Sequence, residues 1–309
     1  MNLRFSKVDL ILLCMIIFWG ANITVIKVAL HNFHPVVFNC LRFTIATLTM
    51  LFLYRDVLHD PPPKKALASL IVLGILGNTC YQFLFIYGVK LSYVSNVSIL
   101  LGTTPIFTTG LASILKIEQV RRRLWIGILL SFFGILCIEI GSKDFHAGNF
   151  STSIGDLLVV TASFAWSLYT AFSKKFVNAY SSRHYVLYTV LFGTMLMIPI
   201  SIPYFRYQDW SQVNFYCWAA VFYSAMLALV YGYSAWYYGV QKIGSTRTSV
   251  YSNLTPVAGL LVGMIFLGER LTWLQWLGAI IIFTGLMMNR FVKGSIMEPE
   301  LNPGIVSTQ

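Results

Sequence analysis

The sequence predicts an all-α integral membrane protein with ten transmembrane helices, arranged as two inverted repeats of five helices each. Three observations lead to this fold class. The composition is apolar with little charge, ten apolar runs have roughly the length that crosses a bilayer, and the same residues recur 147 or 151 positions apart. The composition sets the environment, the runs set the number of helices, and the recurrence sets their symmetry.

The composition is that of a membrane protein. Of the 309 residues, 57% are hydrophobic and 11% are charged, against about 45–50% and about 25% in an ordinary globular domain. This number of charged residues is too small to cover the surface of a soluble protein. We therefore expect the apolar side chains to face a lipid bilayer. The five cysteines are scattered without a CxxC spacing, which implies neither a disulfide framework nor a metal site. No cofactor is expected.

Ten runs of about 20 residues carry few charges, as a helix crossing a roughly 30 Å hydrocarbon core requires. The connections between them are short and leave no room for a soluble domain. The expected spans are 9–30, 36–54, 67–88, 93–115, 124–141, 156–177, 185–204, 215–237, 245–267 and 274–292.

The net charge of +11 follows membrane topology rather than a nucleic-acid footprint. If the N-terminus is cytoplasmic and each run crosses once, the cytoplasmic segments hold sixteen basic residues and the outer connections hold four. This is the asymmetry of the positive-inside rule. We therefore expect a multi-pass protein of the bacterial inner membrane with both termini cytoplasmic, and no nucleic-acid partner.

A sequence repeat divides the chain into two halves. Thr104-Pro105 is followed thirteen residues later by Glu118, and Thr255-Pro256 likewise by Glu269, an offset of 151. An offset of 147 pairs Asp9, Trp19 and Lys27 with Asp156, Trp166 and Lys174. Each half has five spans, and because five is odd, the second half enters the membrane from the opposite side.

These residues resemble a known family. Trp19-Gly20, Leu41-Arg42-Phe43, the doubled Thr-Pro to Glu spacing and Gly268-Glu269-Arg270 are similar to the EamA domain of the drug/metabolite transporter superfamily. In one departure, Lys116 to Gln119 replaces the Gly-Glu-Arg motif in the first half. The resemblance implies two EamA repeats, expected at 1–141 and 150–292, followed by a disordered cytoplasmic tail at 293–309. It also implies a central cavity lined by helices one, three and four of each half.

Polar and aromatic residues on those helices are the candidate substrate site. On the third span, Asn78, Tyr81, Gln82 and Phe85 follow the spacing of one helix face. Rings and amides of this kind suit a small organic solute, although the same residues also serve as contacts between membrane helices. The candidate residues are Trp19, Asn22, Asn78, Tyr81, Gln82, Trp166, Tyr169, Tyr233, Trp236 and Asn253.

Two cations and two prolines within spans carry further expectations. Lys27 and Arg42 can either snorkel to the outer surface or face the cavity, where they would attract a carboxylate near an outer gate. Snorkelling is favoured for Lys27, and the two readings are balanced for Arg42. Pro105 and Pro256 each remove a helix hydrogen bond, and these kinks are expected hinges for gating.

The expected function is transport of a small-molecule substrate by alternating access, most simply the export of amino acids or related metabolites, as the resemblance implies. Nucleotide-derived, sugar and amine solutes stay open within the family. No nucleophile with a base and no metal ligands occur at one depth, so an enzyme is not expected, and the polar stripes are too short for a water-filled channel. The acids lie at span ends, which argues against proton antiport. The sequence does not indicate an oligomeric state, and it is compatible with a monomer.

Overall fold

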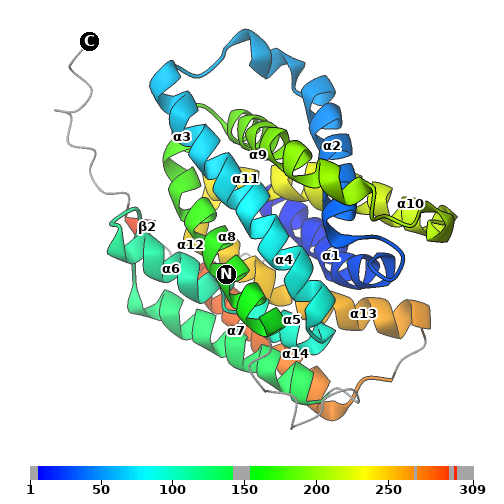
Figure 1. The fold of residues 1–309 in the computed structure, drawn as a ribbon. Coiled ribbons are helices and arrows are strands. Elements are labelled where there is room, and N and C mark those ends of the chain that lie inside the picture. The colour runs from blue at the N-terminus through cyan, green and yellow to red at the C-terminus, as the bar shows by residue number, and fades with distance from the viewer. Residues whose placement is uncertain (1–5, 142–153, 268–269, 292–295, 298–309) are drawn as a thin grey trace, which may run out of the picture.

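The structure is a computed structural model that describes residues 6–141, 154–267, 270–291 and 296–297. These residues form a helical bundle with one two-stranded sheet (Figure 1). The first part of the chain contains α1 (Lys7–Ala29), α2 (Pro35–Leu53), α3 (Lys64–Gly74), α4 (Tyr81–Leu91), α5 (Val94–Leu101), α6 (Thr104–Ile114), β1 (Gln119–Val120) and α7 (Arg122–Ile140). The second part contains α8 (Ile154–Ala179), α9 (Ser182–Phe205), α10 (Phe215–Tyr223), α11 (Gly232–Ile243), α12 (Ser245–Tyr251), α13 (Thr255–Leu267), α14 (Trp273–Phe291) and β2 (Ile296–Met297).

Within the described residues, eight helices or continuous helical runs are long and apolar enough to cross a membrane. They include the run Lys64–Leu91, which joins α3 to α4, and Phe215–Ile243, which joins α10 to α11. The segments expected as ninth and tenth spans are the broken helix from α12 to α13 and the helix α14, whose apolar part Trp273–Met288 is shorter. The chain is therefore a multi-pass, nearly all-helical membrane protein.

The first two helices begin where local chemistry satisfies their free N–H groups. Ser6 and Asp9 form a capping box at the start of α1, in which the Asp9 N–H donates to Ser6 Oγ at 3.3 Å and the Ser6 N–H donates to Asp9 Oδ2 at 2.8 Å. At α2, the His34 side chain accepts from the Val36 N–H, and Pro35 supplies the fixed φ that suits a first turn. Both helix starts are thus encoded locally.

The two longest runs each contain a π-helical segment. One covers Ile75–Cys80 between α3 and α4, and the other covers Ser224–Tyr231 between α10 and α11. Shifted by 151 positions, the second overlaps the first. A π turn is wider than an α turn and is common at functional sites. The first segment also admits the ring of Tyr169, because a Cβ at Gly77 would lie 2.3 Å from that ring.

The helices before the two expected prolines are interrupted. After α5 ends at Leu101, two residues of turn precede α6 at Thr104, and after α12 ends, the 3-10 segment Ser252–Leu254 precedes α13. A hydroxyl supports the first break, because Ser167 Oγ donates to the Thr104 carbonyl at 3.1 Å. Each Thr-Pro pair thus starts a new helix, α6 or α13.

Several contacts join residues separated by 147 or 151 positions. The Thr47 and Thr194 hydroxyls, 147 apart, lie 2.8 Å from each other. Across an offset of 151, Gln82 Nε2 donates to the Tyr233 hydroxyl at 2.7 Å and Ser131 Oγ donates to the Ile282 carbonyl at 3.4 Å. Residues that correspond in the repeat therefore touch each other directly.

Glycines bring α7 and α14 together, and Figure 1 shows these two helices side by side. A Cβ built on Gly134 would lie 2.7 Å from the Gly278 carbonyl oxygen, and one on Gly278 would lie 2.6 Å from that of Gly134. A Cβ on Gly285 would likewise meet the carbonyl of Gly127 at 2.5 Å. Small residues allow this backbone contact, as in other membrane helix pairs.

Glu118 caps a helix of the other half. Its buried carboxylate accepts from the Ser245 N–H at 2.7 Å, the Ser245 hydroxyl at 2.8 Å and the Thr246 N–H at 3.1 Å. These groups open α12, which follows Gly244, whose φ of 89° favours glycine. Glu118, the last residue of the Thr-Pro to Glu spacing, therefore joins the first half of the chain to the second. The counterpart of Glu118 in the second half, Glu269, lies outside the described residues.

Part of the C-terminal tail is ordered against the first half. Ile296 and Met297 pair antiparallel with Val120 and Gln119, so β2 adds a strand to β1. The other residues of the tail expected to be disordered lie outside the described residues. The pairing places this part of the tail at the connection between α6 and α7.

We expect Glu118→Ala to lower the free energy of unfolding by about 2 kcal/mol or more, because two backbone N–H groups and a hydroxyl lose a buried acceptor. The midpoint of thermal unfolding in detergent measures this loss. Glu118→Gln retains one acceptor oxygen and should lose less. Asp209→Ala, which removes an exposed acid that caps a short 3-10 turn, is the control, and a Glu118→Ala protein as stable as this control would contradict the capping role.

Candidate functional site

Two adjoining cavities lie in the middle of the helices. The arginine cavity is lined by Trp19, Asn22, Ile23, Arg42, Tyr81, Gln82, Phe85, Leu101, Trp166, Ala228, Leu229, Tyr233 and Thr255. The proline cavity is lined by Trp19, Ile23, Tyr81, Ser98, Leu101, Gly102, Thr104, Ile135, Trp166, Ser252, Thr255 and Pro256. Six residues line both cavities, so we treat the two as one central site. Its walls come from both halves of the sequence.

Aromatic rings dominate the shared wall of the central site. The ring centroids of Trp19 and Trp166, which correspond in the repeat, lie 5.9 Å apart at 73°, and that of Tyr81 lies 4.9 Å from Trp166. Tyr233 adds a ring 5.2 Å from Trp166. Rings at these distances and edge-to-face or tilted angles stabilise one another. They offer an apolar wall to a solute.

The position of Trp19 depends on the second π-helical segment. Its indole Nε1 donates to the Ala228 carbonyl at 2.9 Å, inside Ser224–Tyr231. A Cβ at Gly232 would lie 2.3 Å from Nε1, so the indole fits only against glycine. Nearby, the Ser224 hydroxyl donates to Asn22 Oδ1 at 2.7 Å. The irregular helix therefore seats two of the sequence-predicted residues, Trp19 and Asn22.

Arg42 does not snorkel to the surface, since it is 1% exposed and lines the arginine cavity. Its Nε donates to Asn39 Oδ1 at 2.8 Å and its Nη2 donates to Gln82 Oε1 at 2.6 Å. The rings of Phe38 and Phe43 lie 5.5 Å and 5.7 Å from its Cζ. In the described part of the chain, no carboxylate lies within salt-bridge distance of this guanidinium. The described partners of this charge are therefore amides and rings.

Lys27 lies away from both cavities, at the end of α4. Its ammonium donates to the carbonyls of Val89 at 2.7 Å, Lys90 at 3.0 Å and Ser92 at 2.7 Å. Carbonyls at a helix C-terminus lack intrahelical partners, and a cation there is favourable. Lys27 thus ties α1 to the turn between α4 and α5.

Four predicted residues are buried without lining either cavity. Asn78 Nδ2 donates to the Tyr169 hydroxyl at 3.3 Å, and that hydroxyl lies 2.6 Å from Thr189 Oγ1. Trp236 Nε1 donates to Thr170 Oγ1 at 3.3 Å. Both amide atoms of Asn253 lack a hydrogen-bond partner among the described residues. These four residues are buried in the protein but do not form the walls of the central site.

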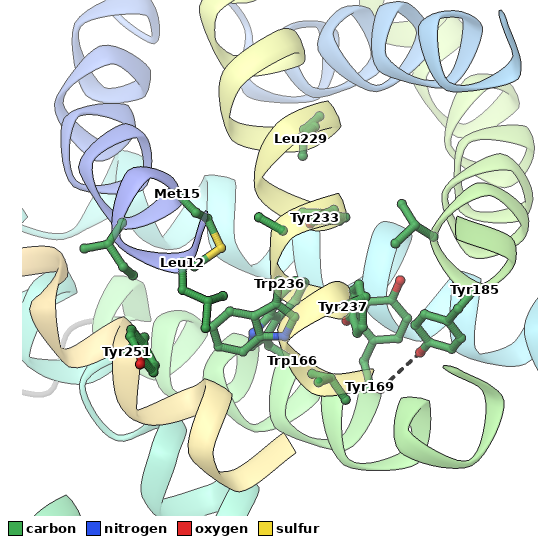
Figure 2. Packing of buried hydrophobic residues seen from close by; sticks show 14 of the residues in the cluster. Leu12, Met15, Trp166, Tyr169, Tyr185, Leu229, Tyr233, Trp236, Tyr237 and Tyr251 are labelled. Carbon is green, nitrogen blue, oxygen red and sulfur yellow. Dashed lines mark hydrogen bonds between the residues drawn. The ribbon is translucent and has the colours of Figure 1, made fainter. Parts of the chain in front are cut away.

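Figure 2 shows how the buried rings continue from the central site. Trp236 and Trp166 lie next to each other with ring centroids 5.8 Å apart, and Tyr169, Tyr185 and Tyr237 follow as a second group. Within that group, the Tyr185 hydroxyl donates to the Tyr169 carbonyl at 3.1 Å. Trp236 and Tyr169 therefore pack against Trp166 without lining the cavities themselves.

Sequence reasoning missed some residues of the site. Asn39 orients Arg42, and its position three residues earlier on the same helix face was the available signal. Thr104 and Thr255 line the cavities immediately before the prolines, where the helix breaks. Leu101, Ala228 and Leu229 carry no polar signal, so only the folded chain identifies them.

The crossing helices and the aromatic, mostly apolar cavity between them define a membrane transporter of small solutes. The chain belongs to the EamA-like transporter family, whose model matches residues 6–140 and 153–291. It is a transporter rather than an enzyme, as its similar proteins are named transporters and efflux pumps.

Relatives of similar length are found in several bacteria. The chain is 26% identical to an uncharacterized transporter, YyaM, of Bacillus subtilis, over 97% of this chain and 98% of that protein. It is 29% identical to a probable amino-acid metabolite efflux pump of Escherichia coli, over 92% and 95%. A solved crystal structure shares the fold with a TM-score of 0.75 at 19% identity, covering 92% of this chain and 96% of the other.

Proposed function

We propose that the protein exports amino acids or related small metabolites by alternating access, with the central site as the substrate site. The observation that carries the proposal is the pair Trp19 and Trp166, two corresponding residues that meet at the wall shared by both cavities. Export of amino-acid metabolites is the activity in the names of the similar E. coli protein and of a 27% identical Salmonella typhimurium protein. Of the ten candidate translocation residues predicted from the sequence, six line the central site, namely Trp19, Asn22, Tyr81, Gln82, Trp166 and Tyr233.

The proposed architecture is ten spans in two inverted repeats, at 1–141 and 150–292. Contacts between residues 147 or 151 positions apart support it, because corresponding residues of two halves meet only near an axis that relates them. The glycine contacts agree with this arrangement. The repeat pairs Gly127 with Gly278 and Gly134 with Gly285, so the contact between Gly127 and Gly285 corresponds to the contact between Gly278 and Gly134. A pseudo-two-fold axis in the membrane plane accounts for both patterns.

For a carrier with such an axis, rocking one half against the other exposes the central site to each side in turn. A channel is the alternative from another class. Continuous polar walls would favour it, whereas Ile23, Leu101 and Leu229 interrupt the polar residues here. Nucleotide-derived, sugar and amine solutes are the alternatives within the family.

Uptake into proteoliposomes tests the proposal most broadly. We expect at least one of a panel of labelled amino acids and amines to accumulate with the wild-type protein. Trp166→Ala and Gln82→Ala should each lower kcat/KM about tenfold or more, equivalent to roughly 1.4 kcal/mol, because each removes part of the cavity wall. Trp273→Ala, which removes an exposed tryptophan, is the matched control and should transport like wild type.

Two results of that assay would count against the assignment. If no solute of the panel moves, export of amino acids or amines is wrong for this chain. If a solute moves at the wild-type rate through both Trp166→Ala and Gln82→Ala, the central site is not the transport site. Equal impairment by Trp273→Ala would point to general destabilisation instead.

The prolines are proposed as the bending points of this motion. Each lies directly after the point where its helix is interrupted, so the backbone there can change angle without breaking helix hydrogen bonds. Pro105→Ala and Pro256→Ala should insert normally and transport about fivefold more slowly, which corresponds to roughly 1 kcal/mol of barrier. Pro199→Ala, inside α9, is the control, and unchanged rates in both hinge variants would reduce these prolines to packing residues.

Both termini are proposed to be cytoplasmic, from the distribution of basic residues. The pairing of β2 with β1 supports placing the C-terminal segment on the side of the basic connection 116–123. In a variant without the five native cysteines, a cysteine at position 61 should resist a membrane-impermeant thiol reagent added to intact cells. A cysteine at position 146 should react. The reverse pattern would invert the topology.

A further inference from the structure

Arg42 is a cation within a span, and no carboxylate in the described part of the chain neutralises it. A charged group in the membrane interior is costly and marks a functional site unless it is paired. Arg42 is 1% exposed, and its described partners are the uncharged amides of Asn39 and Gln82 and the rings of Phe38 and Phe43. Its positive charge is therefore left for a ligand.

Two nitrogens of the Arg42 guanidinium donate hydrogen bonds to described residues. Asn39 holds Nε and Gln82 holds Nη2, while Nη1 has no hydrogen-bond partner within the described residues. Gln82 is itself held, because its Nε2 donates to the Tyr233 hydroxyl. An arginine has five N–H donors in a planar fork, which suits a carboxylate. Because Arg42 lines the arginine cavity, we infer that a ligand there can reach the donors left over.

The cavity lining narrows the chemistry of the ligand. Arg42 is the only charged residue among the described residues that line either cavity. A single guanidinium matches one negative charge, so a monocarboxylate fits better than a doubly charged phosphate ester. A solute whose only charge is an amine meets no carboxylate there and is repelled by Arg42. The ammonium of an amino acid can rest against the faces of Trp19, Tyr81 or Trp166.

We propose that Arg42 is the carboxylate-binding residue of the central site, so that the transported solute carries one carboxylate on an apolar body, and simple amines are rejected. The proposal rests on the proposed function and narrows its substrate class. It sets aside the amine, sugar and nucleotide-derived solutes that the family resemblance leaves open.

Matched solutes separate the carboxylate from the rest of the molecule. The probes are L-phenylalanine, 3-phenylpropionate, phenethylamine and L-phenylalaninamide, with the corresponding set built on leucine. Binding to the purified protein is read from tryptophan fluorescence, because Trp19 and Trp166 line the cavities. Uptake of the same compounds into proteoliposomes is measured in parallel. We expect at least one carboxylate of each set to bind and the matched amine and amide not to compete with it.

Two variants test Arg42 itself. Arg42→Gln should lower the apparent affinity for the carboxylate about thirtyfold or more, the scale of losing one partner of a buried charge pair. Gln82→Glu keeps Arg42 and places an acid at the position that now accepts from Nη2. It should neutralise the guanidinium internally, preserve the fold and cause a similar loss. Arg206→Gln, the same change at an exposed cation, should leave binding unchanged.

The outcomes separate this proposal from the proposed function. Carboxylate binding that depends on Arg42, without uptake, supports the subsite and overturns transport of these solutes. Uptake or binding in which amine and amide match the carboxylate overturns the subsite and leaves the transporter standing. Wild-type affinity in both Arg42→Gln and Gln82→Glu also overturns it, as does the failure of every carboxylate to bind.

Discussion

The central site depends on the two hydrogen bonds that the side-chain amide of Gln82 makes. In the membrane interior no water satisfies a polar group, so each one must find a partner within the protein. Gln82 accepts from Arg42 and donates to Tyr233, which joins α2, α4 and α11 through one amide. Its own backbone carbonyl accepts from Asn39 Nδ2 at 2.9 Å. The buried cation keeps its place because of this network.

The scaffold around that network consists of close backbone contacts. Glycines let α7 meet α14, and Gly88 meets Val159 in the packing of α4 against α8. A Cβ at Gly88 would lie 2.6 Å from the Val159 side chain. These contacts are close-packed backbone contacts, whereas the π-helical segments and the breaks before Pro105 and Pro256 interrupt regular helix beside the cavities. A carrier needs this division, with rigid parts that move and irregular parts that bend.

Hydropathy predicted the positions of the eight long apolar helical runs. For example, the expected span 36–54 is α2 at Pro35–Leu53. It did not predict the π-helical segments, because Ile75–Cys80 has no composition that differs from an ordinary membrane helix. This mattered for the site. Regular helical spacing put Asn78 on the face of Gln82, but the wide turn between them leaves Asn78 against Tyr169 while Gln82 lines the cavity.

Burial was the second limit on prediction from sequence. Trp19 and Trp166 line the cavities, whereas Trp236 packs behind Trp166 and is fully buried. All three are tryptophans inside apolar runs, so the sequence does not distinguish a ring that faces a solute from one that supports it. For Arg42, the charge was visible but its direction was not. The partners that turn it inward, Asn39 and Gln82, come from two different helices.

The most direct measurement of the central claim is a structure of the protein with a transported solute bound, determined in lipid nanodiscs. The account predicts solute density between Trp19 and Trp166, in contact with residues of both halves. Density confined to the apolar groove lined by Leu41, Ile198 and Phe205, with the central site empty of solute, would contradict it.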